Sequence, residues 1–419
     1  MERQGFDIPL LIGGATTSRV HTAVKIHPAY EKGQAIYVTD ASRAVGVVSS
    51  LLTPEARENY IGNIRAEYAK VADAHRKAEA AKNRLPLPAA RANAVKIDWN
   101  AYEPTRPSFL GTKTFEDYDL ETLARYIDWT PFFQTWELRG RYPDILKDEK
   151  QGETARQLFD DAQAMLKKII DEKWFRPRAV IGFWPANAVG DDIRLYKDDS
   201  RSEELATFFT LRQQLSKRGD RPNVAMSDFV APVDSGKGDY VGGFVVTAGF
   251  EEIAIAERFE RANDDYSSIM VKALADRFAE AFAECMHEQV RREYWGYAPD
   301  EAFSNAELVG EAYGGIRPAP GYPAQPDHTE KKTLFELLDA EKETGVELTE
   351  SYAMWPGSSV SGIYIGHPDS YYFGVAKVER DQVEDYARRK GMSIEETERW
   401  LSPILNYIPA DAKPVDDAA

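Results

Sequence analysis

Cysteine and histidine are scarce in this chain. Its 419 residues include one cysteine, Cys285, and six histidines. A single cysteine excludes an internal disulfide framework and fits a reducing compartment, so we expect a cytoplasmic protein with a buried, inert thiol. The sequence also lacks the Ser-His-Asp, Cys-His and zinc-ligand spacings of nucleophilic or metal-dependent catalysis. We therefore predict no catalytic side chain and no metal ligand.

Basic residues and long apolar runs are also in short supply. The chain has 52 lysines and arginines against 69 aspartates and glutamates, which gives a formal net charge of −17. An acidic protein is a poor match for nucleic acid, whose phosphates require a basic face. No apolar run approaches the roughly 18 residues of a membrane-spanning helix, and no secretion signal opens the chain. The sequence predicts neither a nucleic-acid-binding nor a membrane protein.

Helical and β-rich runs follow one another irregularly after residue 98. Helical patterns are predicted at 154–173, 252–263, 267–292, 333–344 and 380–390, and β-rich runs at 178–184, 239–248, 362–364 and 371–378. A parallel sheet requires steady β-α-β alternation, which is missing here. We predict an α+β domain with a mostly antiparallel β-sheet and surrounding helices.

The first 52 residues follow a different pattern. An apolar run at 8–12 leads into the turn Gly13–Gly14, and a helical, an apolar and a second helical stretch follow. This order predicts one edge of an incomplete α/β, Rossmann-like sheet, which we expect to be weakly stable or to pack on a partner. A glycine turn alone is compatible with any nucleotide site, but an oxidoreductase would need a complete GxGxxG motif and an acidic ribose ligand, and both are missing.

A charged linker joins these two regions. Residues 53–97 are rich in alanine, arginine, lysine and glutamate and contain Pro86 and Pro88 near their end. This composition predicts a helix that stops at the prolines. We therefore divide the chain into an N-terminal piece (1–52), a helical linker (53–97) and a main domain (98–419).

The segment 314–338 is the most unusual stretch of the main domain. Four prolines fix φ and remove backbone donors, which predicts a stiff, extended loop: Pro318, Pro320, Pro323 and Pro326. Arg317 carries a permanently charged fork suited to a carboxylate, and Gly321 permits close approach before the aromatic Tyr322. Such residues suit a site that grips an amino-acid-like ligand. The alternative is a surface connection whose arginine pairs with a neighbouring acid.

A series of motifs extends over most of the chain. They are IDWTPFF (127–133), FWPAN (183–187), GDDI (190–193), SDFVAP (227–232), DDYSSIMVKALADR (264–277), YWGYAP (294–299), RPAPGY (317–322), HTEK (328–331), LTESYAMWPGSSVSG (348–362), HPDS (367–370) and RDQVEDYARRKGMS (380–393). In this order they closely resemble the S-adenosylmethionine-binding reactivation domain of cobalamin-dependent methionine synthases. The first 52 residues resemble the end of the cobalamin-binding domain of the same family.

The resemblance implies a function in methionine biosynthesis. Such a domain binds S-adenosylmethionine and presents its methyl group to cob(II)alamin while a flavodoxin-like donor supplies one electron. The protein then contributes orientation and electrostatics. The implied partners are the electron donor and the remaining domains of methionine synthase, without which this chain would not make methionine. The alternative is a stand-alone S-adenosylmethionine-binding partner or sensor subunit without turnover.

The resemblance also assigns roles around the amino-acid part of the ligand. Arg317 would bind the carboxylate and Asp128 the ammonium group, whereas Glu280 and Glu311 would surround the positively charged sulfonium. Glu280 belongs to a row of acids at 276, 280 and 284, which repel one another at this spacing unless a cation faces them. The plainer readings are a helix cap for Asp128 and a solvated helix face for the acidic row.

Further residues would enclose the adenine end. By resemblance, the backbone at Ala319 and Gly321 would hold the adenine, and Tyr322 and Tyr372 would line the pocket, where a ring face can accept a cation. Phe373 would lie beside them, and it stands where related sequences have a tyrosine. The plainer reading of Tyr372 is a half-buried strand residue.

Cobalamin, as methylcobalamin, is expected to be held mainly by residues outside this chain. By resemblance, Gly13, Gly14 and Ala41 would lie along the nucleotide tail of cobalamin. The family's Asp-x-His-x-x-Gly signature, which carries the cobalt-ligating histidine, does not occur in the sequence. Zinc would belong only to upstream domains. We therefore expect Met1 to be an internal methionine of a longer enzyme.

Two further features suggest how the domain meets its surroundings. An acidic electron donor would need a local basic patch, for which the sequence RRK at 388–390 is a candidate. His328 titrates near neutral pH and would suit a switch, and the alternative is an ordinary surface histidine.

Overall fold

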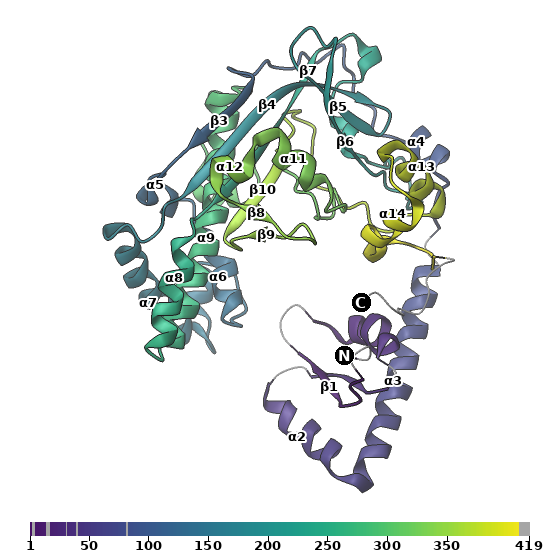
Figure 1. Cartoon of the computed structure of the whole chain (residues 1–419), viewed down its shortest axis with the longest axis vertical. Coiled ribbons are helices and arrows are strands. Elements are labelled where there is room, and N and C mark those ends of the chain that lie inside the picture. The colour runs from purple at the N-terminus through teal and green to yellow at the C-terminus, as the bar shows by residue number, and fades with distance from the viewer. Residues whose placement is uncertain (2–4, 14–16, 31, 39–40, 81–82, 410–419) are drawn as a thin grey trace. The chain divides into compact units, whose positions relative to one another are not determined.

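The chain divides into two compact units, each with its own hydrophobic core. The computed structural model describes residues 1, 5–13, 17–30, 32–38, 41–80 and 83–409. The first unit comprises Met1–Arg84 and the second Leu85–Pro409 (Figure 1). The large cores lie in the second unit, and a small one centred on Ile36 lies in the first.

In the first unit, two short parallel strands are joined through a helical segment. β1 (Leu10–Ile12) pairs with β2 (Ala35–Tyr37). The helical elements are α1 (Arg19–His21), η2 (Thr22–Ile26), η3 (His27–Ala29), α2 (Ala41–Leu52) and α3 (Pro54–Ala80). This is the order that the sequence predicts. Two strands do not establish a Rossmann-like sheet, so that assignment stays a prediction.

The long helix α3, which covers much of the predicted linker, packs on the first unit. Tyr68 of α3 accepts a hydrogen bond from the Tyr37 N–H at 2.7 Å, and Arg65 Nε donates to Gln34 Oε1 at 3.0 Å. The helix is thus fastened to β2 and to the residue just before it.

The second unit is built on a six-stranded sheet in which every neighbouring pair is antiparallel. Its strands are β3 (Gly111–Phe115), β4 (Arg178–Val189), β5 (Asp192–Tyr196), β6 (Glu204–Phe209), β7 (Asp239–Thr247) and β10 (Ser359–Tyr364). The order is β10-β7-β4-β5-β6, and β4 is the central strand. It pairs with β7 along one side, and on its other side its first half pairs with β3 and its second half with β5. A separate pair joins β8 (Glu347–Leu348) to β9 (Met354–Trp355). The predicted α+β class with an antiparallel sheet is confirmed.

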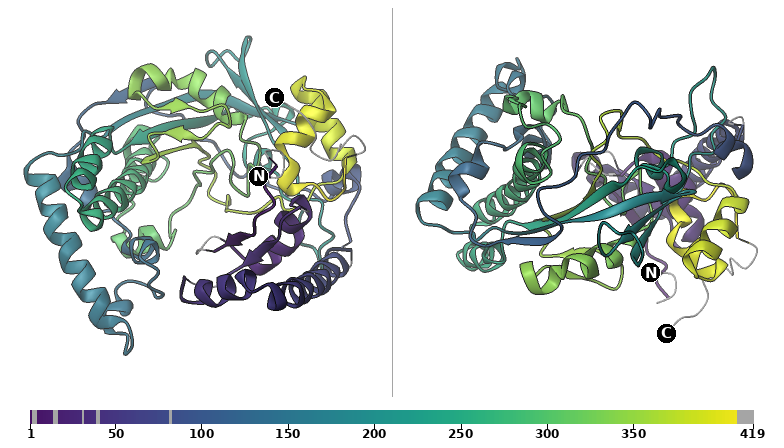
Figure 2. Two further views of the ribbon diagram at one scale, coloured as in Figure 1. Left: turned by 60° about the horizontal axis from the view of Figure 1, so that its bottom comes forward. Right: turned by 90° about the horizontal axis from the view of Figure 1, so that it is seen from above.

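Helices cover both faces of this sheet (Figure 2). On one face, α9 (Asp265–Gln289) shares a core with Phe244 and Val246 of β7. On the other face, α11 (Glu330–Leu338) shares a core with Val245 of the same strand. Successive strand residues point to opposite faces, so a strand covered on both sides is buried throughout, as β7 is.

The remaining helices surround these layers. They are α4 (Leu87–Ala92), α5 (Leu120–Ala124), α6 (Trp129–Thr135), η4 (Asp144–Lys147), α7 (Gly152–Asp171), η5 (Met226–Phe229), η6 (Val233–Ser235), α8 (Glu251–Arg261), η7 (Val290–Tyr294), α10 (Asn305–Val309), α12 (Ala340–Thr344), α13 (Arg380–Lys390), α14 (Ile394–Trp400) and η8 (Ser402–Ile404). None of the helices in the described part of the chain is both long and apolar enough to cross a membrane.

The structure corrects two predicted elements. The β-rich run at 371–378 is not a strand, because its backbone hydrogen bonds go to two separate segments. Val375 N–H donates to the Pro323 carbonyl of the proline-rich loop, and Val378 N–H donates to the Ile404 carbonyl at the end of η8. The single helix predicted at 333–344 is two helices, because Asp339 between them adopts a left-handed φ of 48°.

Candidate functional site

The proline-rich loop starts from the edge of the sheet. Ile316 and Ile365 exchange two hydrogen bonds of 3.0 Å, and the Ile363 N–H donates to the Pro318 carbonyl at 2.8 Å. This short extension of β10 ends before Pro320, which has no N–H to donate. The first residues of the loop, including Arg317, are therefore held by the sheet.

Gly321 folds the loop back against His328. Its φ is 94°, and its N–H donates to the Gln325 carbonyl at 2.7 Å. A Cβ at this position would lie 2.4 Å from Cε1 of the His328 ring. Glycine is required here both by the backbone conformation and by the ring beneath it.

His328 is half-buried rather than free on the surface. Its Nδ1 lies 3.0 Å from Nζ of the buried Lys331. Burial, and then the charge of Lys331, lower the pKa of His328. The neutral imidazole that results accepts the lysine's hydrogen bond.

Arg317 lies beneath this loop, where it contacts α9. Its Nη2 donates to Glu284 Oε2 at 2.6 Å, and its Nη1 reaches Tyr313 Oη at 2.7 Å and His287 Nδ1 at 3.0 Å. The side chain is 19% exposed. Burial acts to lower the pKa of Arg317, but Glu284, Tyr313 and Tyr372 together outweigh this effect and raise it, so the guanidinium stays charged. The predicted acidic row therefore does have a cation facing it.

The other members of the acidic row lie nearer to solvent. Glu280 is exposed, yet desolvation by nearby protein atoms raises the pKa of its carboxyl. The charges of Asp276 and Glu284 add to this rise, and those of Arg277 and Arg317 oppose it. Asp276 pairs with Arg277 at 2.5 Å. The site therefore offers carboxylates near solvent beside a partly buried arginine, which suits a ligand that carries both a cation and a carboxylate.

Two exposed tyrosines border this rim. Tyr372 is 39% exposed, and its hydroxyl oxygen accepts a hydrogen bond of 3.0 Å from the Arg317 backbone N–H. Burial raises the pKa of Tyr372, and the nearby Glu311 adds to the rise. Tyr322 is 64% exposed, and desolvation, Glu280 and Asp276 raise its pKa. Electrostatic interactions thus link Glu280 to Arg317 and to Tyr322, and they link Tyr372 to Arg317 and to Glu311.

Other predicted residues have structural roles that are visible in the fold. Asp128 caps α6 by accepting the Thr130 N–H at 2.9 Å. Phe373 packs on Phe229, with ring centroids 6.4 Å apart. The Ala319 carbonyl accepts the Tyr322 N–H at 3.1 Å, which closes a turn within the loop. Ligand contacts for these three residues stay predictions.

The residues predicted to lie along cobalamin belong to the first unit. Gly13 follows β1, and a Cβ there would lie 3.1 Å from the Val38 carbonyl oxygen, so close packing alone favours glycine. Gly14 lies outside the described residues. Ala41 begins α2, and its side chain is likewise outside the described part. Their role toward cobalamin stays a prediction.

The basic patch predicted at 388–390 is wrong. Only Arg388 is well exposed, at 72%. The side chains of Arg389 and Lys390 are 14% and 12% exposed and pair with carboxylates inside the unit. Their charges are neutralised by these partners, so they do not form a surface for an acidic protein.

Three site residues were not predicted from the sequence: Glu284 as a partner of Arg317, His287 and Tyr313. A signal did exist. His287 lies three residues after Glu284, which puts both side chains on one face of α9. Tyr313 lies four residues before Arg317, but only the fold shows that they touch.

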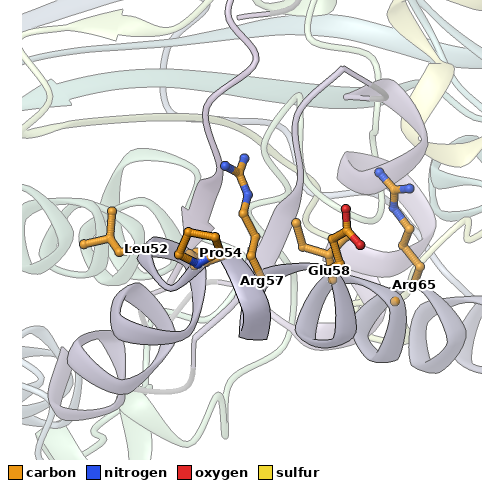
Figure 3. Close-up of a pocket in the computed structure, with 8 residues that line it drawn as sticks. Leu52, Pro54, Arg57, Glu58 and Arg65 are labelled. Carbon is orange, nitrogen blue, oxygen red and sulfur yellow. The ribbon is translucent and has the colours of Figure 1, made fainter.

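Two grooves elsewhere in the described structure contain none of the residues predicted for the site. In the first unit, an open groove is lined by residues of α2 and α3, including Leu52, Arg57 and Arg65 (Figure 3). A smaller one in the second unit is lined by Tyr126 and Glu288 among others. Within the described residues, no group of three or more histidine, cysteine, aspartate or glutamate side chains is arranged to hold a metal ion.

The fold and these side chains define an α+β domain with a site for a charged, amino-acid-like ligand. A family model for the activation domain of vitamin B12 dependent methionine synthase matches residues 119–391. A crystal structure of the MetH reactivation domain bound to AdoHcy is 58% identical, with a TM-score of 0.76, and the match covers 78% of this chain and 99% of that one. The chain belongs to the family of methionine synthase activation domains. The full-length enzymes of this family are methyltransferases.

Proposed function

We propose that the second unit binds S-adenosylmethionine at Arg317 and presents its methyl group for the reductive reactivation of methionine synthase. The proposal is supported by one observation above all: a partly buried, charged arginine lies close to carboxylates and tyrosines. It is also supported by the AdoHcy bound in the similar reactivation domain, since AdoHcy is S-adenosylmethionine without its methyl group.

Arg317 takes the ligand's carboxylate in this proposal. An arginine has five N–H groups. Two on Nη1 and one on Nη2 are used by His287, Tyr313 and Glu284. The N–H of Nε and the second N–H of Nη2 are left, and they suit a bidentate carboxylate contact.

The remaining charges suit the rest of the ligand. Glu280 and Glu311 stabilise the sulfonium by electrostatic attraction, and Asp128 accepts from the ammonium group. The faces of Tyr322 and Tyr372 lie against the cationic part, and the loop backbone at Ala319 and Gly321 holds the adenine. These groups orient the methyl group and exclude water, and none of them has to transfer a proton.

Cobalamin, bound in the full-length enzyme, supplies the cobalt that accepts the methyl group once one electron has been added. The remaining domains of methionine synthase and a flavodoxin-like electron donor are the partners in this proposal. Gly13, Gly14 and Ala41 would contact cobalamin only in the completed cobalamin domain. Zinc would belong to other domains of the full-length enzyme.

The proposal is tested by titrating the purified chain with S-adenosylmethionine in a calorimeter. We expect saturable one-to-one binding, and we expect Arg317→Ala to weaken it by at least about tenfold, because hydrogen bonds to charged groups contribute more than 1.4 kcal/mol. Arg388→Ala is the matched control, since it removes an exposed arginine. Equal affinity in Arg317→Ala and wild type would contradict the proposal.

A further inference from the structure

The immediate neighbours of Arg317 pose a question that the proposed carboxylate contact leaves open. Glu284 lies 2.6 Å from Nη2 through one oxygen, Oε2. Its other oxygen, Oε1, is buried and has no hydrogen-bond partner among the described residues. Arginine and a carboxylate often form two parallel hydrogen bonds. If Glu284 formed such a pair with the Nε and Nη2 edge of Arg317, it would occupy the N–H groups that the proposed function leaves for the ligand.

His287 is placed to prevent this two-point pair. Its Nδ1 lies 3.0 Å from Nη1 of Arg317. Arginine has only donors, so Nδ1 must accept, and a neutral imidazole then carries its proton on Nε2. Because Nη1 is held by His287 and Tyr313, the guanidinium is kept from rotating its Nε and Nη2 edge toward both oxygens of Glu284.

The histidine ring itself cannot easily turn. It is completely buried, stacked on Tyr364 at a centroid distance of 5.3 Å and edge-on to Tyr313 at 5.0 Å. Burial, Arg291 and Arg317 together hold the pKa of His287 well below its usual value. The ring therefore stays neutral at physiological pH and remains an acceptor.

We propose that His287 is a positioning residue that keeps Arg317 out of a two-point ion pair with Glu284 and so leaves its Nε and Nη2 edge open for the carboxylate of an S-adenosyl amino acid. The inference rests on the proposed function and deepens it. His287 acts through Arg317 and does not itself touch the ligand.

Two ligands separate this role from a general effect on the pocket. S-Adenosylhomocysteine has the amino-acid carboxylate, whereas 5′-methylthioadenosine has the same nucleoside and sulfur without it. In His287→Leu we expect the affinity for S-adenosylhomocysteine to fall at least about tenfold, as for loss of a hydrogen bond to a charged group. The affinity for 5′-methylthioadenosine should not change.

Substitutions at the same position and at Glu284 test the mechanism. His287→Asn keeps an acceptor near the place of Nδ1 and should lose less affinity than His287→Leu. Adding Glu284→Gln to His287→Leu should restore part of the affinity for S-adenosylhomocysteine, because the amide cannot form the charged two-point pair. A histidine with a merely structural role would not be rescued in this way.

His367→Leu is the matched control. His367 is also buried, at 4% exposure, and its Nδ1 also accepts a hydrogen bond, from the Asp369 N–H at 3.1 Å. We expect this variant to bind S-adenosylhomocysteine as wild type does.

The outcomes are distinct. Unchanged affinity of His287→Leu for S-adenosylhomocysteine would overturn the inference, and so would an equal loss for both ligands. If wild type bound S-adenosylhomocysteine no better than 5′-methylthioadenosine, or if Arg317→Ala had no effect, the carboxylate contact of the proposed function would fail as well. A loss confined to S-adenosylhomocysteine and relieved by Glu284→Gln supports the inference.

Discussion

At the residue scale, Lys331 has an unusual environment, since it is a buried lysine beside the loop of the site. It is 5% exposed, and its Nζ lies 3.0 Å from His328 Nδ1, a neutral partner. Burial lowers the pKa of Lys331 from 10.5 to about 8. A charged lysine without a carboxylate partner weakens the fold until it loses its proton.

This environment predicts a pH dependence of stability. Below the folded-state pKa of about 8 both states hold the proton, but between 8 and 10.5 the unfolded state binds more protons. The free energy of unfolding of wild type should therefore rise with pH in that interval relative to Lys331→Met. Urea unfolding of both proteins at several pH values measures the difference. A difference that stays constant would contradict this prediction.

Gly321 gives a second prediction at this scale. Gly321→Ala would force a side chain into a left-handed φ and against the His328 ring. We expect lower stability by about 1–3 kcal/mol and weaker S-adenosylmethionine binding, because strain of this kind must be relieved by moving the loop. Gly357→Ala is the control, since a Cβ at Gly357 meets no atom within 4 Å. Equal melting temperatures for the two variants would argue against a strained loop.

The sequence supports prediction of single residues better than of their contacts. Arg317 and Gly321 were identifiable because their residue types have few equivalents: a planar cation and a residue free to adopt positive φ. The contacts of Arg317 were not identifiable, because Glu284 and His287 lie about thirty positions away and meet it only through packing of α9. Tertiary contacts of this kind have no local signal.

At the element scale, α13 fastens the far end of the binding loop. Lys390 at its end contacts Asp327 and Glu330, both at 2.5 Å, and Tyr386 donates to Asp327 at 2.7 Å. Burial acts to lower the pKa of Lys390, but Glu330 and Asp327 outweigh it and raise it. The lysine therefore remains a cation between two carboxylates.

Removing this cation should destabilise the second unit. In Lys390→Met, two buried carboxylates lose their counterion, and we expect a loss of about 3–5 kcal/mol in the free energy of unfolding. Arg388→Met is the matched control, because that neighbouring side chain is 72% exposed. Denaturant unfolding compares the two. Similar stabilities would show that the buried cluster is not what holds the loop.

The same helix illustrates what sequence predicts of an element. Its limits, 380–390, agree with the prediction. The helix ends at Gly391, which adopts a left-handed conformation, and a glycine at a helix end can be recognised from the local sequence. The surface role predicted for its basic end is wrong, because burial of Arg389 and Lys390 depends on distant carboxylates. The missing strand at 371–378 has a similar cause, since its backbone N–H groups donate to a loop and to η8 instead of a neighbouring strand.

At the scale of the whole molecule, the two units differ greatly in the size of their cores. The second unit contains three hydrophobic clusters, while the first has a small cluster around Ile36, Val38 and Leu51 and leaves Val45 and Leu52 at 71% and 77% exposure. A small core supplies little stability. The first unit therefore depends on further contacts, which the remaining domains of methionine synthase would supply under the proposed function.

This difference predicts the behaviour of fragments. Residues 85–409 alone should fold with the melting temperature of the main transition of the whole chain and should bind S-adenosylmethionine with equal affinity. Residues 1–84 alone should show little cooperative unfolding. Circular dichroism melts of both fragments and of the whole chain test this. Loss of binding in the 85–409 fragment would show that the site needs the first unit.

At this scale, the predictions of the family and the fold class from the sequence depended more on the family motifs than on composition. The motifs supported the family and the α+β class because they are long and ordered. The division at residues 52 and 97 stays a prediction, and the compact second unit begins at Leu85. There the Leu85 N–H donates to the Gln214 carbonyl at 2.7 Å and the Leu87 N–H to Asp381 at 2.6 Å. Composition marked the linker but could not show where such contacts begin.

The most direct test is a crystal structure of the chain with S-adenosylhomocysteine. We predict that the ligand carboxylate lies on the Nε and Nη2 edge of Arg317, with Glu280 near the sulfur and the adenine against the loop at Gly321. The contact of Arg317 with His287 should be retained. A ligand bound away from Arg317, or an Arg317 side chain paired with Glu284 through both oxygens while the ligand is present, would contradict the proposed site.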